Sequence, residues 1–375
     1  MTTDPHQQVL DSLASKGRLR ALSPLAGKDF TSNDYLALAD SGALRQAAAE
    51  ALARGVPLGA GGSRLLRGNH PEHEALEEEA ASFFGSETAL YFSTGFAANA
   101  AIAATLPRRD DLIVYDSLIH ASFRDGLEPA RIAAIEAPHN DVGAMDAIIK
   151  GWRAAGGKGR VWIAAETLYS MDGDRAPLAD LVALAARHDA MLVLDEAHAT
   201  GVHGDQGRGL GAQYEGASNI ISLHTCGKGL GAAGALVCLP KLYRDFMVNR
   251  GRAFIYSTAP SPLMAAVVRA ALKISAGAEQ ERTQLQQLVR HAQDHMRGLG
   301  LLPSNSQIQP VILGEDRRAV ALAEALQARG YDIRAIRPPT VPEGTARLRI
   351  ALTLHIAPAD LDNLFADLQA EMAQL

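Results

Sequence analysis

The chain has 375 residues, 47% of them hydrophobic and 21% charged, and its 36 basic and 42 acidic residues give a formal net charge of −6. This length exceeds what one core usually organises, so more than one domain is expected. The acidic balance argues against a nucleic-acid partner. Two cysteines, Cys226 and Cys238, predict no disulfide framework, and without an apolar run of about 18 residues or a signal-peptide core we expect a cytoplasmic protein with no membrane partner.

The N-terminal third predicts helices on either side of a glycine-rich loop. Residues 1–30 are expected to form an amphipathic helix followed by turns, and residues 43–54 a helix. The loop at 55–68 contains two arginines. The segment Pro71–Phe84 has an early proline and is followed by Gly85, which is typical of a complete helix.

From residue 89 onward, short apolar strands alternate with helices. Helices are expected at 95–106 and 178–188. The expected strands are 89–92, 112–115, 131–136, 161–166, 191–194, 220–223 and 235–239. Because uninterrupted apolar strands of this kind are covered on both faces, the pattern predicts an α/β fold with a mostly parallel sheet.

The pattern changes after about residue 260. A long helical region at 262–299 precedes a smaller α+β arrangement, with strands expected at 309–313, 333–336 and 348–353 and helices at 319–329 and 359–375. We therefore expect an N-terminal segment at 1–35, a large domain at 36–274 and a small C-terminal domain at 275–375.

Asp195 and Lys228 are the most informative candidate catalytic residues, since each follows an apolar strand. Functional groups of open α/β sheets gather beyond the carboxyl ends of the strands. A carboxylate at the end of a buried strand needs a cationic partner, which a pyridinium nitrogen would provide, and His198 could support Asp195 in this role. Asp195 could instead cap a helix or bind magnesium. Lys228 stands among small residues and suits a Schiff base. It could instead grip a phosphate, but Gly229 breaks the P-loop pattern.

Three further groups fit a site of this kind. Thr94, Gly95 and Phe96 join a strand to a helix N-terminus, which suits a phosphate, although most such turns bind nothing. An imidazole at His120 could stack on a pyridine ring, although a lone histidine is more often structural. Ser170 follows a strand and could donate to a ring oxygen.

From about Ser32 to the C-terminus the chain resembles the α-oxoamine synthases, a family of fold-type I enzymes that use pyridoxal 5′-phosphate (PLP). Nine segments in the same order carry the resemblance. They are SNDYLAL at 32–38, GAGGSRLLRGNHPEHEALE at 59–77, STGFAAN at 93–99, DSLIHAS at 116–122, HNDV at 139–142, SMDGDRAPL at 170–178, LDEAHATGVHGDQGRG at 194–209, TCGKGLG at 225–231 and IYST at 255–258.

The resemblance implies a role for each matched residue. Lys228 would carry the cofactor and move protons, Asp195 would pair with the pyridine nitrogen, and His120 would stack on the ring. The remaining implied contacts are His198 and Ser170 near the ring O3′, Thr94, Gly95, Phe96 and Thr225 near the phosphate, and Ser257 and Thr258 reaching the phosphate of a partner subunit in a homodimer with shared active sites.

The segment at 336–349, IRPPTVPEGTARLR, is most similar to the branch of the family that condenses L-alanine with a pimeloyl thioester in biotin biosynthesis. The resemblance implies that Arg349 holds the amino-acid carboxylate, that Asn33 lies near the substrate and that Arg20 contacts the acyl chain. Arg337 and Arg347 are expected to be ordinary surface charges. No metal is expected.

The implied reaction is a decarboxylative condensation with a CoA or carrier-protein thioester. Glycine C-acetyltransferase, 5-aminolevulinate synthase and serine palmitoyltransferase activities are alternatives on the same scaffold. A non-catalytic PLP-fold subunit is a more distant alternative, against which the presence of Lys228, Asp195 and His120 argues. A dinucleotide-binding dehydrogenase is disfavoured because no G-x-G-x-x-G follows the first strand.

Overall fold

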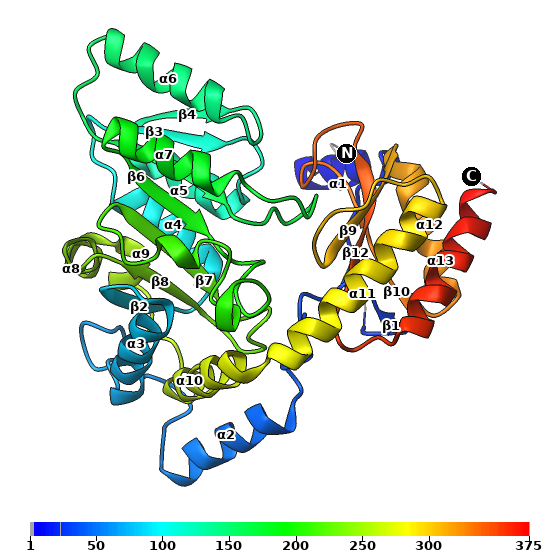
Figure 1. The fold of residues 1–375 in the computed structure, drawn as a ribbon, viewed down its shortest axis with the longest axis horizontal. Coiled ribbons are helices and arrows are strands. Elements are labelled where there is room, and N and C mark those ends of the chain that lie inside the picture. Colours follow the sequence, from blue (N-terminus) through cyan, green and yellow to red (C-terminus); the bar gives the residue numbers. More distant parts are fainter. Residues whose placement is uncertain (1–3, 23, 375) are drawn as a thin grey trace. The chain divides into compact units, whose positions relative to one another are not determined.

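The computed structural model describes residues 4–22 and 24–374 and divides the chain into two compact units (Figure 1). The large unit comprises residues 36–170 and 175–282, and the small unit comprises residues 1–35, 171–174 and 283–375. Residues 1–35, treated above as a segment of their own, thus belong with the C-terminal residues. No described helix is long and apolar enough to cross a bilayer.

The large unit is built on a seven-stranded sheet in the order β2-β8-β7-β6-β5-β3-β4. Its strands are β2 (Thr88–Phe92), β3 (Leu112–Asp116), β4 (Ala133–Ala137), β5 (Val161–Glu166), β6 (Met191–Asp195), β7 (Ile220–Thr225) and β8 (Ala235–Leu239). β8 runs antiparallel to both of its neighbours, β2 and β7, and every other pair in this sheet is parallel. The sheet is therefore mostly parallel, and the expected α/β class is confirmed.

Helices cover both faces of this sheet, and alternate residues of a strand pack into the two separate cores that result. Trp162 and Ala164 of β5 pack in one core with α4 (Gly95–Thr105) and α5 (Ala121–Ala130), whereas Ile163 packs in the other with α6 (Val142–Ala154) and α7 (Leu178–His188). Period-two alternation in a strand buried on both sides produces this division.

The remaining helices of the large unit are α2 (Gly42–Ala53), α3 (Pro71–Phe84), α8 (Lys241–Arg250), α9 (Arg252–Ile255) and α10 (Pro262–Gly277). The end of α3 follows from its sequence, since Gly85 adopts φ 86° and closes the helix in the left-handed conformation. The single helical region expected at 262–299 is instead two helices that break at Ala278, and the boundary between the units falls inside the second, α11 (Glu279–Gly298).

The small unit contains a three-stranded antiparallel sheet, β11-β12-β9, and a two-stranded sheet, β1-β10. These strands are β1 (Lys28–Asp29), β9 (Ile308–Gly314), β10 (Tyr331–Asp332), β11 (Ala335–Ile336) and β12 (Ala346–Ala351). Its other helices are α1 (Pro5–Ser15), α12 (Asp316–Ala328) and α13 (Pro358–Met372). The pairing of β1 with β10 joins the N-terminal residues to the C-terminal part of the chain.

Candidate active site

Asp195 ends β6 and lies beside the carboxyl ends of β5 and β7, where the sheet topology brings distant residues together. Its carboxylate is 5% exposed. One oxygen accepts a hydrogen bond from the Asn99 side-chain amide of α4 at 2.6 Å, and the other accepts from the Ala197 backbone N–H at 2.9 Å. Two hydrogen-bond donors thus hold the buried carboxylate in place at the carboxyl end of this central strand.

Lys228 follows β7 in a glycine-rich turn, and its Nζ lies 2.9 Å from Nε2 of His198. The sequence predicts that His198 supports Asp195, and in the structure Nε2 of His198 also contacts the lysine. The turn packs against backbone of the segment after β6. A Cβ on Gly229 would come within 2.4 Å of the Thr200 carbonyl oxygen, so glycine is required there.

His120 caps the start of α5, and its ring accepts a hydrogen bond at Nδ1 from the Ser122 backbone N–H at 3.2 Å. Partial burial of the imidazole disfavours its charged form and lowers the pKa of His120, although the residue is partly open to solvent. The negative charge of Asp195 raises this pKa, and the positive charge of Lys228 lowers it further. The charges of Asp195 and Lys228 therefore both act on the His120 imidazole, and the three residues form one electrostatically linked cluster.

The N-terminus of α4 faces Thr225 at the end of β7. Thr94 caps the helix by accepting from the Ala97 N–H at 3.0 Å, and a Cβ on Gly95 would lie 2.6 Å from Cγ2 of Thr225. The Thr225 hydroxyl donates to the Ala197 carbonyl at 3.2 Å. Glycine at 95 is needed for this close packing against Thr225, and the first N–H groups of a helix have no partners within the helix.

Ser170 and Glu166 lie at the end of β5. The Ser170 N–H donates to Glu166 at 3.0 Å, and burial raises the pKa of Glu166 well above its usual range, with Asp195 adding to the effect. Glu166 is 2% exposed, and among the described residues its Oε1 has no hydrogen-bond partner. Ser257 and Thr258 are exposed in the segment after α9.

The predicted substrate residues Asn33 and Arg349 meet in the small unit. Arg349, on β12, is 7% exposed and donates to Asn33 Oδ1 at 2.9 Å, and the Tyr35 hydroxyl donates to the same oxygen at 3.0 Å. The shared amide oxygen orients the guanidinium. Residues separated by more than 300 positions are thus brought together.

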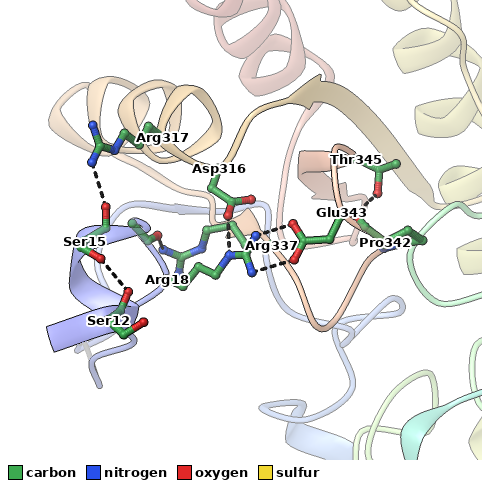
Figure 2. Close-up of polar contacts among 10 residues, drawn as sticks. Ser12, Ser15, Arg18, Asp316, Arg317, Arg337, Pro342, Glu343 and Thr345 are labelled. Atoms are coloured by element: carbon green, nitrogen blue, oxygen red, sulfur yellow. Dashed lines mark hydrogen bonds and ion pairs between the residues drawn. The ribbon is translucent and has the colours of Figure 1, made fainter. Parts of the chain in front are cut away.

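Arg18, Arg20 and Arg337 form a second basic group of the small unit, and Arg18 and Arg337 are drawn in Figure 2. Figure 2 shows the Arg18 guanidinium between Asp316 and Glu343, both of which it contacts as an ion pair. Arg20 is exposed and donates to the Thr340 hydroxyl at 3.1 Å. Burial and the charge of Arg20 lower the pKa of Arg337. Thr340, which Arg20 contacts, donates its backbone N–H to the Arg337 carbonyl at 3.1 Å, so Arg20 and Arg337 lie near each other. Arg18 already has two acidic partners.

Arg347 corrects one expectation. The sequence predicts a surface charge, but Arg347 is 3% exposed and forms an ion pair with Asp172. Its Nε also donates to the Thr345 carbonyl at 3.0 Å. Every residue of β12 is buried, so this short strand has no exposed side on which a surface charge could lie.

Asn99 is the residue that sequence reasoning missed. It was quoted only as the end of the STGFAAN segment and given no role. Its position four residues after Gly95 at the start of α4 places it one turn into the helix, on the side that meets β6. An asparagine within an otherwise alanine-rich buried helix is the signal that could have identified it.

PLP fits the residues of the large unit. The group offers an amine, a buried carboxylate, an imidazole and a helix N-terminus, which match the aldehyde, the pyridine nitrogen, the ring face and the phosphate of that cofactor. Glycine at 95 lets the start of α4 pack closely against Thr225, which keeps that hydroxyl-bearing residue beside the helix N-terminus.

Comparisons with known proteins agree with this site. The model of the aminotransferase class I and II family matches residues 28–368. An 8-amino-7-oxononanoate synthase of Herminiimonas arsenicoxydans is 42% identical over 91% of this chain and 89% of its own length, and one of Anaeromyxobacter dehalogenans is 40% identical over 98% and 95%. A serine palmitoyltransferase of S. paucimobilis, solved with a bound PLP–myriocin aldimine, superposes with a TM-score of 0.90 at 25% identity over 99% of this chain and 97% of that one.

A crystal structure of 8-amino-7-oxononanoate synthase from Francisella tularensis superposes with a TM-score of 0.79 at 27% identity, covering 93% of this chain and 98% of that one. The chain belongs to the aminotransferase class I and II family. It has the fold of the type I PLP enzymes, it is an enzyme, and its cofactor is pyridoxal 5′-phosphate.

Proposed function

We propose that this enzyme condenses L-alanine with a pimeloyl thioester to give 8-amino-7-oxononanoate, CO2 and the free thiol, a step of biotin biosynthesis in the cytoplasm. The observation that carries the proposal is the identity of 40–42% to proteins of that name over 91–98% of the chain. The resemblance of the 336–349 segment to the same branch supports it.

The large unit supports an acid–base role for Lys228. The bound cofactor supplies an electron sink for the charge that develops at the substrate Cα. Lys228 holds the cofactor at rest, takes the Cα proton and returns one after CO2 leaves. Its contact with His198 at 2.9 Å orients the amine for both transfers. We assign His198 and Ser170 to the cofactor O3′ side.

Asp195 and His120 would hold the cofactor ring. The carboxylate, oriented by Asn99, would pair with the pyridine nitrogen, and the imidazole would lie against the ring face. Thr94, Gly95 and Phe96 would bind the phosphate through backbone N–H groups, together with the hydroxyl of Thr225. We propose a homodimer in which Ser257 and Thr258 reach the partner's phosphate, in agreement with their exposure next to Tyr256, which is 72% exposed.

The small unit would select the substrates. Arg349, oriented by Asn33, would bind the carboxylate of L-alanine, since a planar guanidinium matches a carboxylate. Arg20 would bind the acyl chain at its free carboxylate, because it is exposed and forms no ion pair among the described contacts, whereas Arg18 is paired with two acids. No nucleic acid, membrane or metal takes part in the reaction.

Substrate preference tests the proposal directly. The purified protein, reconstituted with PLP, is titrated with L-alanine, glycine and L-serine while its visible absorbance is followed, and thiol release is then measured with pimeloyl-CoA. We expect a spectral shift with L-alanine and thiol release with the pimeloyl donor. A preference for glycine and acetyl-CoA or succinyl-CoA would refute the assignment within the family.

Serine palmitoyltransferase activity is the second candidate, since several structures of that enzyme superpose with TM-scores near 0.9. L-Serine with palmitoyl-CoA is therefore included. Lys228→Ala should keep the fold, as judged by circular dichroism, and lose steady-state turnover with every pair. Substantial turnover in that variant would contradict the role of the lysine.

A further inference from the structure

His291, His295 and Asp362 form a cluster in the small unit that the proposed reaction does not use. The two histidines are four residues apart on α11, in the sequence HAQDH, and so lie on one face of the helix. Asp362 reaches them from α13. Nε2 of each ring lies 2.8 Å from the same carboxylate oxygen, Asp362 Oδ1.

We propose that these three residues bind one divalent transition-metal ion of the zinc class. Their ligand atoms all lie within 4.8 Å of one another. Tetrahedral ligands about 2.1 Å from zinc are separated by about 3.4 Å, so the Nε2–Oδ1 distances of 2.8 Å need to open by only a fraction of an ångström for each pair. Two imidazoles and a carboxylate form a donor set that zinc, copper and nickel prefer over magnesium or calcium.

Neighbouring side chains hold the donors in place. The ring of His295 stacks on Phe365 of α13 with its centroid 5.0 Å away and an interplanar angle of 8°, and the two imidazoles meet edge to face at 4.9 Å. Asp294, Gln369 and the cluster line a hollow of about 550 Å³. The hollow leaves space for water to complete the coordination, while the stacked ring limits the rotamers available to His295.

Such an ion would connect α11 to α13, the last helix of the chain. Each ring then presents an unprotonated Nε2 to the metal and carries its proton on Nδ1. The carboxylate now accepts from two imidazoles and would instead share their metal. The site lies outside the residues assigned to catalysis, so the proposal does not depend on the proposed reaction.

Zinc titration of the full-length protein saturated with PLP tests the site. Isothermal calorimetry should show one saturable Zn²⁺ per chain, and His291→Gln or Asp362→Asn should weaken it at least about tenfold. His6→Gln is the matched control, because His6 is an exposed histidine 2.9 Å from Asp4 and has no second histidine in its cluster. The affinity of the control should equal that of the wild type.

A second measurement separates loss of the site from loss of folding. Zn²⁺ should raise the unfolding temperature of the wild type and of His6→Gln but not that of the two cluster variants, all four having the same circular dichroism. The proposal is overturned if the wild type shows no saturable binding. It is equally overturned if the cluster variants bind as the wild type does, which would direct attention to the buried group Glu215, His224 and Cys238.

Discussion

The hydrogen bond from Asn99 to Asp195 offers a quantitative test of the cofactor site. Replacing Asn99 with leucine keeps the number and branching of the side-chain heavy atoms and removes the donor 2.6 Å from the carboxylate of Asp195, a residue that is 5% exposed. A hydrogen bond to a charged group contributes about 1.5–3 kcal/mol. Leucine is a better helix former, which offsets less than about 0.7 kcal/mol. We expect the cofactor-free protein to lose about 1–2.5 kcal/mol of unfolding free energy.

PLP should restore part of this loss. A pyridine nitrogen that pairs with Asp195 gives the carboxylate a new partner, so the variant gains more stability from the cofactor than the wild type does. Thermal unfolding with and without PLP measures both effects, at about 2–4 °C per kcal/mol for a unit of this size. Asn219→Leu is the control, since Asn219 donates to the Ala190 carbonyl away from the site and should lose equal stability in both states. Equal losses for the Asn99 variant in both states would refute the pairing of Asp195 with the cofactor.

Three further predictions concern other parts of the chain. Arg349→Lys should raise KM for the amino acid about tenfold or more while the absorbance of the bound cofactor is unchanged; an unaltered KM would exclude the carboxylate role. Glu77→Gln breaks a buried ion pair with Arg64, whose partners are 7% and 8% exposed, and should cost about 3–5 kcal/mol in urea unfolding; a loss no larger than that of the exposed control Glu74→Gln would contradict this. Burial raises the pKa of Glu215 to about 7, so between pH 4.5 and 7 the folded protein keeps a proton that the unfolded chain releases. The stability that Glu215 contributes is therefore fully present below pH 4.5 and is lost as the pH rises to 7. Glu215→Gln should therefore match the wild type at pH 4.5 and exceed it by about 3 kcal/mol at pH 8; parallel pH profiles would show that the carboxyl is not buried in this way.

The strands of the large unit were predictable because burial on both faces leaves an apolar run that few other structures produce. Helices α5, α6, α8 and α9 were missed, and the first two show a physical reason. Their sequences, ASFRDGLEPA and VGAMDAIIKGWRA, contain glycine or proline, which disfavour helix in isolation. Side-chain caps from His120 and Asp141 and packing against the sheet stabilise them instead. Local propensity does not report tertiary contacts of this kind.

The break between α10 and α11 was hidden for a similar reason. Gly277 weakens the helix, but the turn at Ala278 is also held by Arg282, which is 5% exposed and donates to the Ser275 carbonyl at 2.7 Å. An arginine at that position looks like an ordinary exposed helical residue in the sequence. Its burial depends on the fold of residues 201–207, to which it also reaches.

The sequence names candidate catalytic residues one by one, but it does not name the side chains that they contact. Because apolar strands end at Asp195 and Thr225, the sequence predicts that the site lies at the carboxyl ends of these strands. The pairing of Asn99 with Asp195 joins residues 96 positions apart, and the contact of Lys228 with His198 depends on two loop conformations. The sequence pattern contains no information on which of several nearby groups a flexible lysine contacts.

Structural and sequence similarity emphasise different relatives. The fold superposes on serine palmitoyltransferase with a TM-score of 0.90 at 25% identity, and on an 8-amino-7-oxononanoate synthase with 0.79 at 27%, whereas relatives at 40–42% identity carry the second name. A backbone shared by enzymes with different acyl substrates does not by itself select one of them. The choice must then reside in side chains that differ between these enzymes on a common scaffold. Arg20 and Arg337, two cations near each other in the small unit, would favour an acyl chain that ends in a carboxylate over one that ends in a methyl group. Comparing pimeloyl-CoA with an uncharged acyl-CoA of equal length, in the wild type and in Arg20→Gln, would therefore reveal whether this pair of charges sets the specificity.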